Sequence, residues 1–206
     1  MSERVADRMK TCLADALWGC LVTRSLTGLS VGDVIEVAGV SRGSFYYHFS
    51  DLDHLVSWAL ARELLDSDRE GHSFLELAAR EETPEENPAV TRSLERVCLL
   101  LGRGGMSAVY EVALDAVLRL WEAALCPDGG PLPDEVVAQL EYAVGGLVGM
   151  LARASVSTDA KRRVSIAFLH ERHRWLVARV SEVLGREPRD VMALLGRART
   201  RDAVTG

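Results

Sequence analysis

Residues 29–55 read LSVGDVIEVAGVSRGSFYYHFSDLDHL, and this stretch is the most informative about the fold. Ser30 is a favourable N-cap, because its hydroxyl can accept the backbone N–H of residue 33. Gly39 suits the left-handed conformation that ends a helix, and Ser41 begins a new helix within two residues. Two short helices joined by so tight a turn are typical of a helix-turn-helix, which places the N-terminus of its second helix in the major groove of DNA.

The second helix, expected from Arg42 to Phe49, carries side chains that suit a DNA-reading surface better than a core. Arg42 can fork onto a guanine edge, and Gly43 lets the backbone come close. Groups that can donate to phosphates follow at Ser44, Tyr46, Tyr47 and His48. Phe45 and Phe49, four residues apart, are the expected inward anchors. Burial of Tyr46 against the first helix, over residues 3–23, is the alternative for that residue.

Outside this stretch, Gly and Pro residues divide the chain into further helices, and no segment alternates with period two for long enough to be a strand. Ser50 or Asp51 is expected to cap the fourth helix. The helices are expected over residues 3–23, 52–70, 88–102, 107–125, 134–154, 159–184 and 188–199. The predicted fold is all-α, with a DNA-binding domain over residues 1–51 and a larger helical regulatory domain over residues 52–206.

Composition limits the class of protein. Of the 206 residues 48% are hydrophobic and only 6% aromatic, so the core is expected to be rich in Leu, Val and Ala. The net charge of −6 is divided into −2 over residues 1–55, −10 over residues 56–150 and +6 over residues 151–206. A protein that coats nucleic acid would be strongly basic, so DNA binding must come from individually placed contacts.

The sequence contains no pattern typical of secretion, of a membrane span or of catalysis. We find no signal peptide and no uninterrupted run of 18 apolar residues, which predicts a soluble cytoplasmic protein with no membrane partner. The four cysteines form no Cys-x-x-Cys pair and are expected to be free, mostly buried thiols. His170 and His173 lie one turn apart, but no neighbour completes a metal site. Neither a cofactor, a metal nor an enzymatic activity is expected.

The run from Ala38 to Phe49 resembles the helix-turn-helix signature of the TetR family of transcription regulators. The resemblance covers about residues 5–60 and continues as a similarity of helix number and length. It implies that Ser30, Ser44, Tyr47 and His48 hold phosphates, that Arg42, Gly43 and Tyr46 face bases, that Ser41 caps the reading helix, and that Lys10 or Arg8 reaches the DNA backbone. It also implies a homodimer on a near-palindromic double-stranded operator, controlled by a small-molecule effector.

Three positions depart from the family pattern. Gly32 stands where the family often has a basic residue, Ile35 where it usually has alanine, and Leu52 where it often has lysine. Each missing cation removes one phosphate contact, so DNA binding is expected to depend less on salt than in a basic relative.

Two groups of residues in the second domain are candidates for effector binding and dimerisation. Gly145, Gly146 and Gly149 interrupt an otherwise good helix, so a close helix–helix contact is expected there, either within one subunit or across a dimer interface that would also include Phe168 and Trp175. Aromatic, Met and Cys side chains at helical spacing are candidates for a ligand cavity, with ordinary core as the alternative. They are Trp58, Phe74, Cys98, Met106, Tyr110, Leu114, Trp121 and Met150.

The sequence therefore predicts a homodimeric repressor whose ligand prefers one spacing of the two DNA-binding domains. The alternative is a sensor or interaction protein of the same fold with weak or lost sequence-specific DNA binding, which the departures at Gly32, Ile35 and Leu52 would favour.

Overall fold

The computed structural model describes residues 3–65, 88–155 and 159–195, and every regular element in these ranges is helical. The all-α prediction is confirmed. The N-terminal module consists of α1 (Glu3–Thr23), the short 3-10 helix η1 (Leu26–Gly28), α2 (Val31–Ala38) and α3 (Arg42–His48). The helical body consists of α4 (Leu52–Leu65), α6 (Pro88–Gly102), α7 (Met106–Leu125), α8 (Asp134–Ser155), α9 (Asp159–Leu184) and a final helical segment over residues 188–195.

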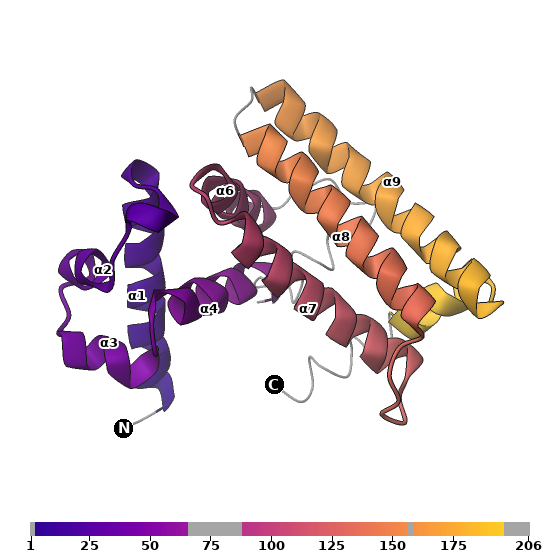
Figure 1. Cartoon of the computed structure of the whole chain (residues 1–206), viewed down its shortest axis with the longest axis horizontal. Coiled ribbons are helices and arrows are strands. Elements are labelled where there is room, and N and C mark those ends of the chain that lie inside the picture. The colour runs from indigo at the N-terminus through magenta and orange to yellow at the C-terminus, as the bar shows by residue number, and fades with distance from the viewer. Residues whose placement is uncertain (1–2, 66–87, 156–158, 196–206) are drawn as a thin grey trace.

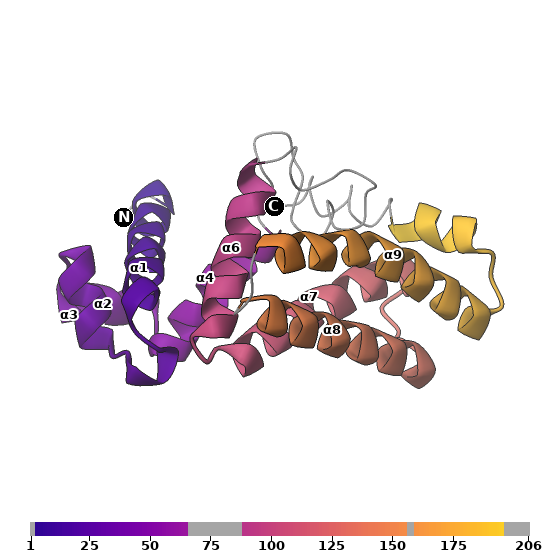
Figure 2. The same cartoon turned by 90° about the horizontal axis from the view of Figure 1, so that it is seen from above.

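Figure 1 shows how these parts are arranged. The N-terminal module lies at one end of the molecule, and α4 leads from it into the helical body. In the body, α8 and α9 run side by side along the edge remote from the module, an arrangement that both views show (Figure 2). The surfaces of α2 and α3 and the surface of α8 are therefore far apart in the molecule.

Local capping fixes the helix-turn-helix. The Ser30 hydroxyl accepts the Asp33 backbone N–H, and the Asp33 carboxylate accepts the Ser30 backbone N–H at 2.8 Å, which completes a capping box. Gly39 ends α2 with a φ of 65°, and Ser41 caps α3 by accepting the Ser44 backbone N–H at 3.1 Å. These three predictions are confirmed.

The beginning of α4 resolves an alternative that the sequence left open. The Asp51 carboxylate accepts the backbone N–H of His54 at 2.7 Å, as an N-cap does. Ser50 instead donates its hydroxyl to Asp51 at 2.9 Å and its backbone N–H to His54 Nδ1 at 3.3 Å. Asp51 is thus the cap, and its hydrogen bonds from His54 and Ser50 lower the pKa of its carboxyl.

A first hydrophobic cluster joins the N-terminal module to the helical body. Phe45 and Phe49 of α3 are 0% and 1% exposed, and they belong to one cluster with the α1 residue Leu17, the α4 residue Leu60 and the α6 residue Leu100. The cluster continues across residues 51 and 52, where the sequence places its domain boundary. The module and the body therefore share one hydrophobic core.

A second hydrophobic cluster lies at the other end of the body. It is built around Trp121 of α7, Leu140 of α8 and Val180 of α9, and the final helical segment covers it with Val191 and Leu195. Helix α7 packs on both sides, because its N-terminal half belongs to the first cluster and its C-terminal half to the second.

Polar contacts reinforce the junction between module and body. Arg96 of α6 forms ion pairs with Glu63 of α4 and, at 3.1 Å, with Asp15 of α1, and its guanidinium lies 5.5 Å from the centre of the Trp18 ring. Directly after α6, the Arg103 backbone carbonyl accepts the backbone N–H of Leu26 at 2.8 Å, and the Arg103 guanidinium donates to the Val22 carbonyl. Helix α6 therefore holds both α1 and η1.

Two observations qualify the expectations about solubility and cysteines. By length and composition alone, the Asp134–Arg153 part of α8 could cross a membrane; 28% of it is buried, and it packs against α6, α7 and α9. All four cysteines are free, as predicted. The expectation that most are buried is wrong, because only Cys20 and Cys98 are buried, whereas Cys12 is exposed on α1 and Cys126 is half-buried.

Candidate nucleic-acid interface

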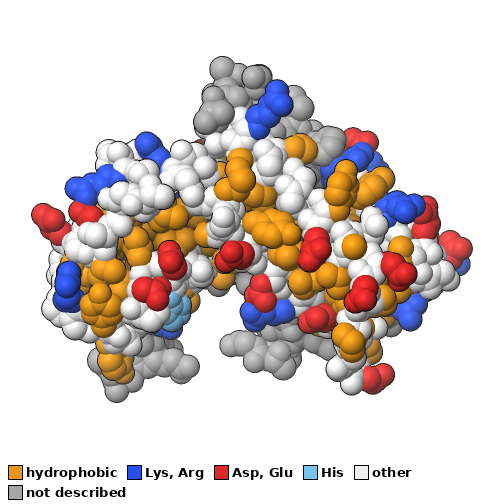
Figure 3. Space-filling view, viewed as in Figure 1, with side chains coloured by type: hydrophobic (Ala, Val, Ile, Leu, Met, Phe, Trp, Pro, Cys, Tyr) orange, Lys and Arg blue, Asp and Glu red, His pale blue; other side chains and the backbone are white. Residues whose placement is uncertain are grey.

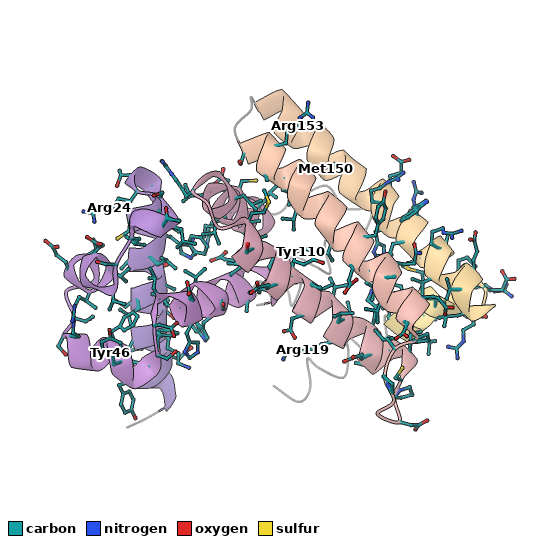
Figure 4. The ribbon with its side chains drawn as sticks, in the orientation of Figure 1. Arg24, Tyr46, Tyr110, Arg119, Met150 and Arg153 are labelled. Carbon is teal, nitrogen blue, oxygen red and sulfur yellow. The ribbon has the colours of Figure 1, made fainter. Side chains whose placement is uncertain are left out.

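Helix α3 presents a polar and aromatic face to solvent. Tyr46 and Tyr47 are 51% and 71% exposed, and Arg42 and Gly43 at the start of the helix are exposed as well. Burial of Tyr46 against α1 is thereby ruled out, and its side chain points away from the module (Figure 4). The face combines the Arg42 guanidinium at the start of the helix with the phenol hydroxyls of Tyr46 and Tyr47 in its second turn, and these groups can reach base edges and phosphates.

The two buried phenylalanines hold this face in place. The Phe45 and Phe49 rings are 5.9 Å apart, and Phe49 continues edge to face into Trp58 of α4 at 5.8 Å. The Tyr46 ring packs edge to face on Phe45 at 5.3 Å, so its base is fixed while its hydroxyl remains in solvent. The half-buried His48 packs against Tyr47 at 4.9 Å. The packing of these aromatic rings thus holds the two-turn helix α3 in place.

The serine hydroxyls expected to hold phosphates are engaged in capping. Ser30 Oγ donates to Asp33 Oδ2 at 2.6 Å, and Ser41 Oγ and Ser44 Oγ lie 2.9 Å apart and share a hydrogen bond. A hydroxyl has one proton to donate, so Ser30 must release Asp33 before it can donate to a phosphate. Phosphate contacts by Ser30 and Ser44 remain predictions.

The Asp33 carboxylate is the most strongly stabilised anion of the module. Hydrogen bonds from the Ser30 hydroxyl and backbone, followed by the bond from Arg24, lower the pKa of Asp33 to about 2. The Arg24 guanidinium forms an ion pair with the same carboxylate. The N-terminal turn of α2 therefore holds an ionised carboxylate at every physiological pH.

Lys10 and Trp58 form a group that the sequence did not predict. The Lys10 ammonium lies 5.8 Å from the centre of the Trp58 ring, and the Arg62 guanidinium lies 5.5 Å from it. Arg62 also donates to the Thr11 hydroxyl, which ties α4 to α1. Trp58 thus lies within cation–π distance of two cations at the junction of module and body. The exposed Arg8, on α1 shortly before Lys10, remains the other candidate for a backbone contact.

The structure distributes the candidate pocket residues over different parts of the body. Trp58, Cys98, Tyr110 and Leu114 belong to the first cluster or pack against it, whereas Trp121 belongs to the second cluster. Met150 is half-buried on α8, Met106 is 50% exposed at the start of α7, and Phe74 lies outside the described residues. Four of the candidates that the structure describes therefore belong to the first cluster or pack against it.

The three glycines of α8 point in different directions. A Cβ atom on Gly145 would lie 3.6 Å from the Tyr110 ring of α7, so this glycine packs within the subunit. Cβ atoms on Gly146 and Gly149 would meet no atom within 4 Å, and both residues are exposed. Close packing within one subunit therefore explains Gly145 and leaves the other two unexplained.

The outer surface of α8 and α9 also carries aromatic residues. Tyr142 of α8 is 72% exposed, and its ring lies 6.3 Å from that of the half-buried Trp175 of α9. The side chain of Phe168 lies outside the described part of the chain. Elsewhere on the body, acidic side chains are spread over the face that includes α7, where Glu111, Asp115 and Glu122 are exposed (Figure 3).

One ion pair at the start of α2 was not predicted from the sequence. Arg24 follows the last residue of α1, and only the folded chain brings its guanidinium to Asp33 at the start of α2. The available signal was the composition of α2, VGDVIEVA, which has two carboxylates and no cation. A cation supplied from another element is what such a helix needs if it is to approach DNA.

Comparison with known proteins addresses the N-terminal part of the chain. Residues 13–57 match the family model described as bacterial regulatory proteins, tetR family. The match begins in the middle of α1 and ends in α4, so it contains the whole helix-turn-helix. No curated protein matches the chain. Within the described residues, no group of three or more His, Cys, Asp or Glu side chains could hold a metal ion.

Proposed function

We propose that this chain, whose residues 13–57 match the family model described as bacterial regulatory proteins, tetR family, is a transcription regulator of this type. It acts as a homodimeric repressor whose binding to its operator is controlled by a small molecule. The observation that carries the proposal is the exposed face of α3. Arg42, Tyr46 and Tyr47 are presented to solvent on a helix whose Phe45 and Phe49 are buried. Groups that can read bases and bind phosphates are thereby held on a rigid support.

The surface of α8 supports dimerisation. Gly146 and Gly149 leave open space on an exposed helix face, which lets a second helix approach closely, and Tyr142 provides exposed aromatic surface nearby. Two subunits related by a two-fold axis beside α8 and α9 form a four-helix bundle from these helices, and the dimer carries two copies of α3. Such a dimer would recognise two half-sites separated by roughly one turn of DNA, about 34 Å, or slightly more.

Control by an effector is supported by the connection between body and module. The first cluster is shared by both, and α6 holds α1 through Arg96 and η1 through Arg103. A ligand that binds among the first-cluster residues Cys98, Tyr110 and Leu114 would shift α6 and α7 and with them the module. The ligand changes DNA binding only to the extent that it prefers one arrangement of the modules over another.

The test is a selection of random duplex DNA on the purified full chain at moderate salt, followed by sequencing. We expect enrichment of a near-palindromic site. Arg42→Ala should relax the preference at one base position per half-site, at a cost of about 1–3 kcal/mol for the preferred base. Arg189→Ala, at an 85% exposed position near the end of the body, is the matched control and should leave the selected sequence unchanged.

The alternative, a sensor or interaction protein without sequence-specific DNA binding, is favoured by the absence of cations from α2. If a folded dimer by light scattering enriches no sequence and binds all duplexes equally and weakly, this alternative replaces the repressor.

A further inference from the structure

Helix α2 is negatively charged, which is unfavourable for the first helix of a helix-turn-helix. That helix crosses the sugar-phosphate backbone while the second helix enters the groove. Helix α2 carries Asp33 in its first turn and the exposed Glu36, and it has no Lys or Arg. Two carboxylates beside a row of phosphates would repel the DNA unless a cation from another element offsets them.

The cation paired with this helix is Arg24. Its guanidinium forms an ion pair through Nη1 with Asp33 Oδ1, and its backbone N–H continues the α1 pattern by donating to the Cys20 carbonyl at 3.0 Å. Its side chain is 53% exposed, whereas that of Asp33 is 22% exposed. Figure 4 shows Arg24 at the end of α1 beside α2, on the module whose α3 carries Tyr46. An arginine has five N–H donors, so an ion pair at one nitrogen leaves others for a second anion.

The other cations of the module whose side chains the structure describes are placed differently. Lys10 lies over the Trp58 ring at the junction with α4, Arg8 is on the N-terminal part of α1, and Arg42 begins the helix that enters the groove. Arg24 is the one whose charge is fixed at the start of α2, and this placement is not a consequence of chain adjacency, because nine residues separate it from Asp33.

We propose that Arg24 is a DNA-phosphate contact of this regulator, held by Asp33 so that its remaining donors face the sugar-phosphate backbone. Ser30 orients Asp33 through two hydrogen bonds, and Asp33 in turn orients Arg24. The guanidinium offsets the carboxylate and offers a planar fork that matches phosphate oxygens. This contact supplies the positive charge that α2 itself lacks. The inference rests on the proposed DNA-binding function.

The competing explanation is that Arg24 only stabilises the fold by pairing with Asp33. The two explanations differ in what happens when Asp33 loses its charge. A structural pair is broken equally by Arg24→Gln and by Asp33→Asn. A phosphate contact is removed by Arg24→Gln, whereas Asp33→Asn retains the cation and removes a repulsive anion.

The experiment measures the dissociation constant of the full chain for a mixed-sequence duplex of about 30 base pairs over a series of salt concentrations, because phosphate contacts do not depend on sequence. We expect Arg24→Gln to reduce the slope of log K against log salt by about 0.9 and to weaken binding several-fold at low salt. Asp33→Asn should bind as tightly as the wild type or more tightly, without loss of slope, because the amide oxygen of asparagine can still accept a hydrogen bond from Arg24 while the repulsive charge is removed. Arg24→Lys should retain the slope, and Arg189→Gln should behave as the wild type.

An unchanged slope in Arg24→Gln, or a loss of affinity in Asp33→Asn equal to that in Arg24→Gln, would overturn the inference and leave the proposed function intact. Thermal melts of each variant show whether the fold is retained. If Arg24→Gln does not fold, the test uses Arg24→Lys and the Arg24→Gln, Asp33→Asn double variant. The inference then requires that Arg24→Lys retains the slope and that the double variant has a reduced slope. A wild-type chain that binds no duplex at the lowest salt would overturn the proposed function and this inference with it.

Discussion

Helices α3 and α8 both have an exposed surface that packs against nothing within the subunit, but the two surfaces differ in composition. Helix α3 has seven residues and exposes large groups, Tyr46 and Tyr47, around a buried pair of phenylalanines. Helix α8 has 22 residues and exposes positions without a side chain, Gly146 and Gly149, beside Tyr142. In the proposed function, the surface of α3 offers hydrogen-bond donors to DNA, and the surface of α8 leaves room for a helix of the second subunit.

The difference lies in how much each surface depends on the rest of the molecule. The exposed groups of α3 are chemically distinctive, so their use can be inferred from the residues and the short turn that precedes them. Glycines have no such chemistry, and three of them within one helix can indicate close packing within one subunit or across a dimer interface. Their directions relative to α7 separate Gly145 from Gly146 and Gly149, and this separation requires the folded arrangement of the helices.

The largest expected effect is on the anchor of α3. Phe45→Ala removes a ring that is 0% exposed, and we expect a loss of about 3–5 kcal/mol in the free energy of unfolding, measured by urea denaturation. Tyr47→Ala, on the same helix at a 71% exposed position, is the control and should change stability by about 0.5 kcal/mol or less. Equal losses in the two variants would remove the distinction between anchor and reading face.

The corresponding change on α8 should affect assembly and leave folding intact. Gly146→Glu places a carboxylate in the open space of the proposed dimer interface, once in each subunit, and we expect dimerisation to weaken by about 3 kcal/mol, a factor of roughly 100 in the dissociation constant. Sedimentation velocity measures this constant. Gly19→Glu is the control, because a Cβ atom on this exposed glycine of α1 would also meet no atom within 4 Å. A dimer that tolerates the α8 change would place the interface elsewhere.

The junction between module and body offers a smaller effect. The Glu63 side chain is 10% exposed and accepts from Arg96 and, at 2.9 Å, from Ser93. Glu63→Gln should lower the free energy of unfolding by about 1–3 kcal/mol, since it removes the charge that Arg96 faces. Because the first cluster is continuous, α1 and α4 should melt together in both proteins, as followed by hydrogen exchange. Glu111→Gln, on an exposed position of α7, should have little effect, and separate melting of α1 would contradict the shared core.

The smallest effect concerns pH. The pKa of Asp33 in the folded chain is about 2, below the usual value of 3.8, so its hydrogen bonds contribute stability that is present above about pH 4 and is lost as the pH falls toward 2. Asp33→Asn should lack this part of the acid dependence, measured as the urea midpoint against pH, whereas Asp128→Asn in the exposed loop after α7 should retain it. Parallel curves for wild type and Asp33→Asn would show that the capping box is not formed in solution.

Much of the module could be predicted because its determinants are local. Ser30, Gly39 and Ser41 act within three residues of their own positions, and all three behave as expected. The failures concern contacts between elements. Lys10 lies against Trp58, Arg24 pairs with Asp33 across nine residues, and Met106 is half exposed although its helix is apolar. Periodicity shows that a helix has a buried face, but it does not show which neighbour covers each residue.

The residues alone were enough to predict an all-α chain and a helix-turn-helix over residues 29–55, because caps, turns and periodic apolar residues act over a few positions. They left open whether Tyr46 is exposed or buried. The folded arrangement was needed to establish that Tyr46 is exposed, that Asp51 caps α4, that α6 holds α1 and η1, and that two of the three α8 glycines face outward. These outcomes depend on packing between residues distant in the chain, and such packing is set by the shapes of whole helices rather than by any local pattern.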